Sequence, residues 1–70
     1  MTTQETPRAI APGKPIFINW RGLQGRETID SVYPEQFATR ADMRREASRL
    51  ICEYALAGMP GAYTSTRECN

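Results

Sequence analysis

Two glycines and two arginines form the first grouping in this chain that could do chemistry. Gly22 and Gly25 bracket two residues, and Arg21 and Arg26 flank the glycines. A G-x-x-G loop with basic neighbours can hold a nucleic-acid backbone, as it does between two helices of a KH domain. Here the glycines separate two alternating segments, and no helix start follows that could direct its dipole at a phosphate. We therefore predict the turn of a β-hairpin, with a basic tip exposed to solvent.

The sequence contains few of the residue types that catalysis needs. The 70 residues include no histidine, so the commonest general base and the commonest metal ligand are both absent from the sequence. The stretch "YTSTRE" near the end is rich in hydroxyl groups, but no base can be named that would activate one. We therefore expect no enzymatic activity, no cofactor and no metal site.

The two cysteines, Cys52 and Cys69, are too few for a zinc site or a disulfide framework. Cys52 falls about half a turn away from the apolar stripe of the helix predicted below, so we expect it to be exposed. A disulfide bond between Cys52 and Cys69 would require the outer face of that helix to face the last strand. This conflicts with the apolar stripe, which should face the sheet. We therefore predict two free thiols, and the sequence leaves their redox role open.

Net charge and hydropathy limit the setting of the protein. Nine basic and eight acidic residues give a formal charge of +1, whereas nucleic-acid-binding domains usually have a strongly basic balance. The chain contains neither the apolar run of a signal peptide nor a segment that could cross a bilayer. We expect a soluble protein of the cytoplasm.

Two alternating segments predict the hairpin strands. In "KPIFINWR" one face receives Ile16, Ile18 and Trp20. The opposite face receives Phe17, Asn19 and Arg21. In "RETIDSVY" the alternation pairs Ile29 with Tyr33 on one side and Thr28 with Val32 on the other.

The segment "TRADMRREASRLICEYALAGMPG" predicts a helix over residues 40–57. Thr39 and Asp42 have the spacing of a capping box. One apolar stripe follows at helical spacing, made of Met43, Ala47, Leu50, Ile51 and Tyr54. Gly58 can adopt the left-handed conformation that ends a helix, and Pro60 prevents continuation.

The short segment "AYTSTRE" reads as a third strand because of its tyrosine and threonines. A right-handed crossover through the helix places this strand antiparallel beside the first. We therefore expect an α+β fold of the ββαβ type, with one helix on one face of a three-stranded sheet in the order 2-1-3. Residues 1–13 lack any helix or strand period and should form a flexible arm, followed by a single domain over residues 14–70.

A single helix covers only one face of such a sheet, so we expect the other face, with Phe17, to be open to a partner. Trp20 is either part of the core under the helix or an aromatic anchor in an interface. On the helix, Arg45 and Arg49 share the outer face with three acidic residues that can neutralise them. Arg40 and Arg44 lie off that face.

From Trp20 to Cys69 the chain resembles a group of small, mostly uncharacterised proteins of phages, prophages and plasmids. The motifs that carry this resemblance are "WRG", "ETID", "TRADMRREA", "EYALA" and "YTSTREC". The chain departs from the group by a longer connection, "SVYPEQFA". The resemblance implies a ββαβ domain and a mobile-element setting, and none of its motifs is catalytic.

Two function hypotheses follow. The first is a non-enzymatic protein of a phage or mobile element that binds and occludes a host protein or assembly, including a CRISPR-type defence complex, inside the bacterial host cell. The candidate partner-binding residues are Phe17, Trp20, Arg21, Arg26, Arg40 and Arg44. The alternative is a nucleic-acid-binding accessory protein that uses the basic hairpin tip and the helix start on phosphates. The sequence leaves open whether two copies pair as a homodimer.

Overall fold

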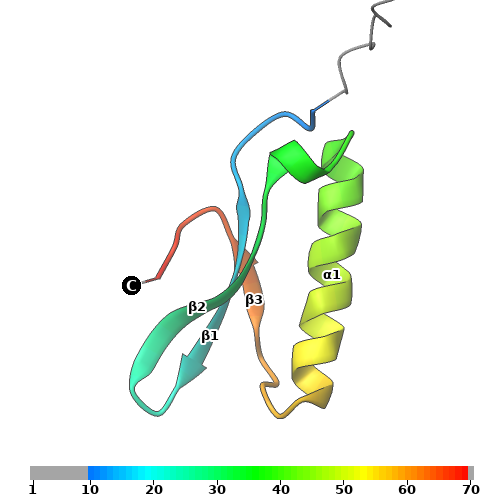
Figure 1. The fold of residues 1–70 in the computed structure, drawn as a ribbon. Helices are drawn as coiled ribbons and strands as arrows, with labels where there is room; N and C mark the ends of the chain where they lie inside the picture. The colour runs from blue at the N-terminus through cyan, green and yellow to red at the C-terminus, as the bar shows by residue number, and fades with distance from the viewer. Residues whose placement is uncertain (1–9, 70) are drawn as a thin grey trace, which may run out of the picture.

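The computed structural model describes residues 10–69, which form a three-stranded antiparallel sheet with one helix against it (Figure 1). The elements in chain order are β1 (Ile16–Gly22), β2 (Gly25–Val32), the short 3-10 helix η1 (Pro34–Gln36), α1 (Arg40–Leu56) and β3 (Tyr63–Ser65). The strand order is β2-β1-β3, and β1 is antiparallel to both neighbours. The predicted ββαβ fold and its strand order are therefore confirmed.

Both ends of α1 form as the local sequence dictates. The Thr39 hydroxyl accepts a hydrogen bond from the amide of Asp42 at 3.1 Å, which satisfies one of the free donors of the first turn. At the other end Gly58 has a φ of 95°, and the amide of Met59 donates to the carbonyl of Tyr54 at 2.8 Å. This is the 6→1 bond of a Schellman motif, for which a left-handed glycine is preferred.

The core lies between β1, β2 and the apolar stripe of α1. Ile18 and Met43 are fully buried, and Ala47 is almost so. The other stripe residues are half-buried and pack against this cluster, together with Ile29, Phe37 and Ala62. The predicted stripe is therefore the face of the helix that contacts the sheet. No helix within residues 10–69 is both long and apolar enough to cross a membrane.

A β-bulge changes the side-chain pattern of β2. Ile18 lies opposite Asp30 and Asn19 lies opposite Thr28, so Ile29 is an extra residue on β2. An extra residue resets the alternation along a strand. Ile29 and Val32 therefore both pack in the core, although they are three residues apart. The predicted alternation, with Ile29 and Tyr33 on one side of the strand and Val32 on the other, was wrong, because Ile29 packs in the core with Val32 while Tyr33 is exposed.

The packed part of the chain includes residues ahead of the expected boundary at Lys14. Ala11 is only 4 % exposed, and its amide donates to the carbonyl of Phe37 at 2.8 Å. The guanidinium of Arg40 donates to the carbonyls of Pro12 and Lys14. These bonds hold residues 11–14 against the start of α1. The rest of the predicted arm, residues 1–9, lies outside the described residues.

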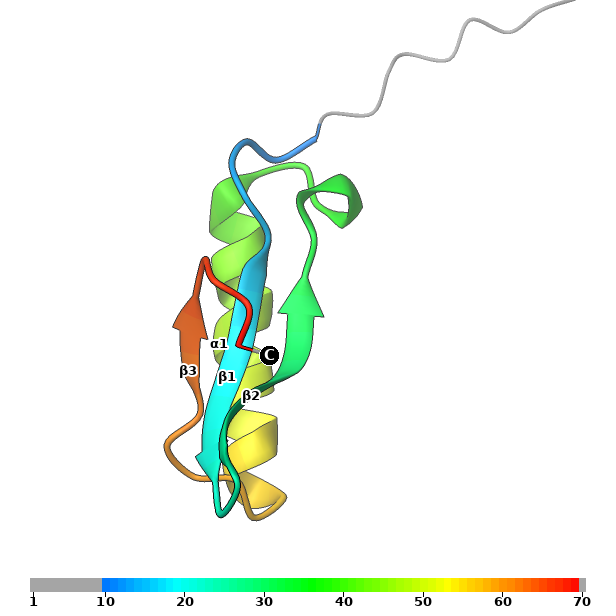
Figure 2. The same ribbon diagram turned by 90° about the vertical axis from the view of Figure 1, so that its left-hand side faces the viewer.

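The sequence led us to expect that the face of the sheet opposite α1 would be open. In the structure this face is covered. Residues 66–69, the C-terminal segment, fold back across it, as the two views of the ribbon show (Figures 1 and 2). The side-chain amide of Asn19 donates to the carbonyl of Arg67 at 3.0 Å, and the Thr28 hydroxyl accepts from the amide of Cys69 at 2.8 Å. Asn19, predicted on this face, is only 1 % exposed because the C-terminal segment covers it.

Candidate functional site

Residues 23–27, at the end of the β1–β2 hairpin, are all exposed to solvent. Gly22 pairs with Gly25, so Leu23 and Gln24 alone form the turn. The hairpin predicted from the two glycines is confirmed. Leu23 is an apolar side chain that is fully exposed to solvent. We call residues 20–27 the hairpin tip, and this segment is the candidate site.

The two glycines of the tip serve different purposes. Gly25 has a φ of 108°, a conformation that side chains other than glycine rarely adopt. Gly22 does not have a positive φ, but a Cβ there would lie 2.6 Å from the ring of Trp20. Gly22 is therefore required because the Trp20 ring approaches it closely. Gly25 is required because its backbone has a positive φ.

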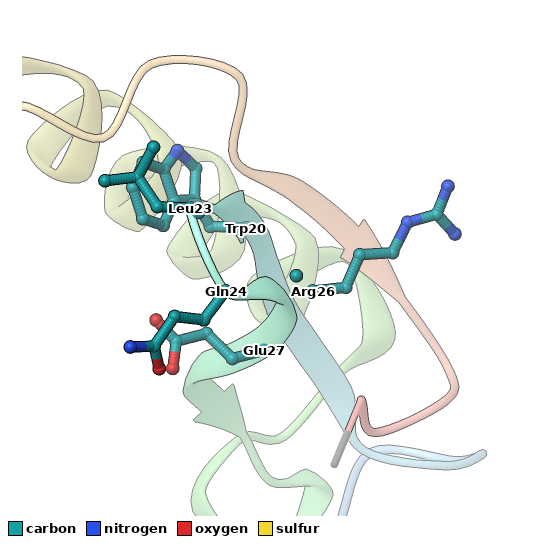
Figure 3. A pocket seen from close by; sticks show the side chains of 7 residues that line it. Trp20, Leu23, Gln24, Arg26 and Glu27 are labelled. Atoms are coloured by element: carbon teal, nitrogen blue, oxygen red, sulfur yellow. The ribbon is translucent and has the colours of Figure 1, made fainter.

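Trp20 forms one wall of a shallow hollow of about 410 Å³ at the tip. The remaining lining comes from residues 22–27, including Leu23, Gln24 and Glu27 (Figure 3). The indole nitrogen donates to the carbonyl of Pro60 at 3.0 Å, which ties the ring to the loop between α1 and β3. Trp20 is half-buried, so its ring is held in place while part of it faces solvent. It is an aromatic surface held by its hydrogen bond to the loop between α1 and β3.

Arg21 and Arg26 lie directly opposite each other across the two strands, and both are exposed. Like charges in this arrangement repel each other. Among the described residues neither arginine forms an ion pair. Figure 3 shows Arg26 pointing away from Trp20 and Leu23, so the tip has an apolar side and a basic side.

The basic side extends beyond the hairpin. Arg67, in the C-terminal segment, is exposed, and its carbonyl accepts from Asn19, two residues before Arg21 on β1. Asn19 and Arg21 share the face of β1 that is opposite α1. The C-terminal segment therefore adds a third arginine to the face that carries Arg21 and Arg26.

The other predicted site residues lie elsewhere. Phe17 is half-buried near the beginning of β1, opposite Ser31 and Ser65, and is not part of the tip. Arg40 is occupied by its bonds to the backbone carbonyls before β1. Arg44 is exposed and lines a separate groove between α1 and β3. The structure thus brings Trp20, Arg21 and Arg26 together at the tip. The remaining three candidates lie away from it, and two of them, Arg40 and Arg44, line one hollow between α1 and β3.

Sequence reasoning missed the turn residues themselves. Leu23, Gln24 and Glu27 line the hollow, yet none was a candidate. The signal that could have found Leu23 is an apolar residue in a two-residue hairpin turn, where polar residues are usual. Gln24 and Glu27 carry no such signal.

The outer face of α1 is neutralised as predicted. Arg49 pairs with Glu46 at 2.7 Å and with Glu53 at 2.9 Å, and Arg45 pairs with Asp42. Hydrogen bonding with Thr39 and then Arg45 lowers the pKa of the Asp42 carboxyl, and hydrogen bonding with Arg49 lowers the pKa of Glu46. Exposed pairs of this kind are worth little individually, but they cancel the charge of this face.

Within residues 10–69 no group of three or more cysteine and carboxylate side chains is placed to hold a metal ion. Both cysteines are free, with Cys52 exposed and Cys69 partly so. Comparisons of the chain with protein-family models, with curated proteins and with solved structures found no match.

Proposed function

We propose that this chain is a small binding module of a phage or other mobile element, and that its hairpin tip occupies a surface of a host protein. The observation that carries the proposal is the fully exposed Leu23 beside the half-exposed ring of Trp20. An exposed leucine at a turn adds nothing to the core, and covering it in an interface is worth about 1.5–3 kcal/mol.

The neighbours of Leu23 match the composition of an interface centre. Tryptophan and arginine are the residue types that most often dominate binding energy, and the tip has Trp20, Arg21 and Arg26 within seven residues. The turn is only two residues long, so little conformational entropy is lost when it docks. Arg21 and Arg26 favour a partner surface with carboxylates, since their mutual repulsion is relieved by opposite charge.

Occlusion is the mechanism that such a module can perform without a reactive group. The partner would be a protein or assembly of the bacterial host cell, including a CRISPR-type defence complex. The bound domain would block that surface sterically, and no cofactor is needed.

Capture from host lysate tests this proposal. Wild type should recover a specific protein, and Leu23→Asp should recover at least roughly tenfold less, because a charge would replace the apolar contact. Leu56→Asp is the matched control, since Leu56 is almost as exposed but lies at the end of α1. Equal recovery by wild type and Leu23→Asp, or an equal loss with Leu56→Asp, would contradict the proposal.

One observation favours nucleic acid as an alternative partner. Arg21 and Arg26 form the basic side of the tip, and Arg67 of the C-terminal segment lies on the same face of the sheet. Among the described residues none of these three arginines is in an ion pair. Phosphate-led binding through three arginines should weaken as salt rises, with a slope of log affinity against log salt of about −2 to −3. Gel retardation of single- and double-stranded DNA at low salt measures it. Absence of retardation removes this alternative.

A further inference from the structure

A groove runs between β3 and α1, away from the hairpin tip. In the order β2-β1-β3, strand β3 has a partner on one side only. Figure 2 shows α1 behind β1, with β3 at its flank. Two adjoining hollows of about 300 Å³ and 230 Å³ occupy this flank. Ile16, the first residue of β1, lines both hollows, whereas the last residue, Gly22, lines the hollow at the tip.

The groove has an apolar floor and polar walls. Ile16 and Ala47 are buried residues that form its floor. Its lining from α1 consists of Arg40, Arg44 and Ser48. Residues 64 and 65 line it from β3, and residue 66 lines it from the start of the C-terminal segment. The floor provides apolar contact, and the hydroxyl groups of the walls provide hydrogen bonds.

Arg40 and Arg44 both bring positive charge to the groove, and Arg44 is the one with an unbonded side chain. Its neighbours Arg40, Arg45 and Arg49 are all bonded to carbonyls or carboxylates. The side chain of Arg44 forms no hydrogen bond or ion pair with any other residue between 10 and 69. In the described part of the chain no acidic residue lines either hollow. The lining of the groove therefore contains no carboxylate that could pair with Arg44.

We propose that this groove binds an extended, acidic segment of another protein, which adds as a fourth strand to β3 and places a carboxylate against Arg44. A terminal strand directs half of its backbone N–H and C=O groups away from the sheet, where an added strand can bond to them. Alternate side chains of the added strand face the same side. Every second residue of the segment thus faces α1, and an aspartate or glutamate there can reach Arg44.

Charge and shape favour this occupant over two others. A nucleic-acid strand needs several phosphate contacts, and Arg44 is the single arginine here that is not already bonded. A second copy that paired its β3 with this β3 would bring the sequence "YTS" to the edge, and that sequence has no carboxylate. An acidic segment supplies both the strand and the missing charge.

A library of random seven-residue peptides tests the inference. Wild type should select peptides enriched in aspartate or glutamate, and Arg44→Glu should reverse the selection toward lysine or arginine. A selected acidic peptide should lose roughly tenfold in affinity when its carboxylate is changed to an amide. Methylating its backbone nitrogens should abolish binding, because the strand donors are removed without any change in the protein. Bound peptide should shift the NMR signals of Ile16, Ala47 and Thr64.

Leu23→Asp separates this groove from the hairpin tip. The variant should bind the selected peptide as wild type does, whatever it does to capture of a host protein. The inference is overturned by the absence of acidic enrichment, by identical selection with Arg44→Glu, or by unchanged binding of the methylated peptide. Displacement of the peptide by a single-stranded oligonucleotide that shifts the same signals would assign the groove to nucleic acid and would also overturn it.

Discussion

The hydroxyl of Tyr54 on α1 donates a hydrogen bond to the carboxylate of Asp30 on β2 at 2.7 Å. The second oxygen of Asp30 accepts from the amide of Ser31, also at 2.7 Å. Asp30 can face the helix because the extra residue Ile29 precedes it in the bulge. One carboxylate therefore joins the irregular part of the sheet to the last turns of the helix.

Tyr54→Phe should lower the free energy of unfolding by about 1 kcal/mol at neutral pH, because the bond to Asp30 is lost and the ring is kept. Urea unfolding measures this. Tyr33→Phe is the control, since Tyr33 is exposed, and it should change stability little. An equal effect of both variants would contradict the role of the Tyr54 bond.

Tyr54 should also shape stability at alkaline pH. Hydrogen bonding to Asp30, with burial second, raises the pKa of the Tyr54 phenol above its ordinary value of 10.0. A raised pKa means that folding favours the protonated phenol, so its stabilisation is complete below pH 10 and declines as the pH rises through the raised value. Stability of wild type should therefore fall more steeply above pH 10 than that of Tyr54→Phe. Parallel curves for the two proteins would refute this.

The C-terminal segment should depend on Thr28. Its hydroxyl donates to Asn19 at 2.7 Å and accepts from the amide of Cys69 at 2.8 Å. Thr28→Val removes both bonds and leaves buried Asn19 short of a partner, so we expect a loss of about 2 kcal/mol. Hydrogen exchange should show faster exchange at the Cys69 amide. Thr64→Val, on the outer strand, is the matched control and should leave that amide protected.

The side chain of Arg40 should stabilise the fold, whereas that of Arg44 should not. Arg40→Met loses the bonds to the carbonyls of Pro12 and Lys14, which hold Ala11 in the core. We expect a loss of about 1–2 kcal/mol and faster exchange at the Ala11 amide. Arg44→Met removes an exposed side chain with no such bonds and should leave both quantities unchanged. Equal losses would show that the charge of the helix start, rather than these bonds, is responsible.

Gly22 and Gly25 should respond differently to alanine. The new methyl group of Gly22→Ala would meet the ring of Trp20 and break its bond to Pro60, so emission from the only tryptophan should shift to longer wavelength. Gly25→Ala meets open space but keeps a positive φ, so it should cost about 1–2 kcal/mol without that shift. A wavelength shift with Gly25→Ala alone would contradict this assignment.

The free protein should be a monomer. The sequence left open a dimer through the Phe17 face or through an edge strand, and the C-terminal segment lies across that face. Light scattering at micromolar concentration should give a mass of 7.9 kDa. Twice that mass would show that an edge strand or the hairpin tip pairs with a second copy.

Local interactions explain which features the sequence determined by itself. The cap at Thr39, the left-handed Gly58 and the hairpin turn each depend on hydrogen bonds or backbone angles within about six residues. Periodicity set the buried face of α1 for the same reason, since it follows from helix geometry alone. The strand order needed only the handedness of one crossover in addition. Arg21 and Arg26 could be predicted as basic residues of the hairpin tip because they flank that turn.

Contacts between distant residues were decided by the tertiary structure alone. The bulge at Ile29 follows from how β2 fits against β1, and the pattern of β2 read in isolation wrongly put Ile29 and Val32 on opposite sides of the strand. The C-terminal segment contacts β1 and β2 some 40 to 50 residues away along the chain. Arg40 and Arg44 look alike in the sequence, yet only Arg40 meets carbonyls, because residues 12–14 pass beside it and not beside Arg44. Such contacts depend on how whole elements pack, and no short sequence pattern records that packing.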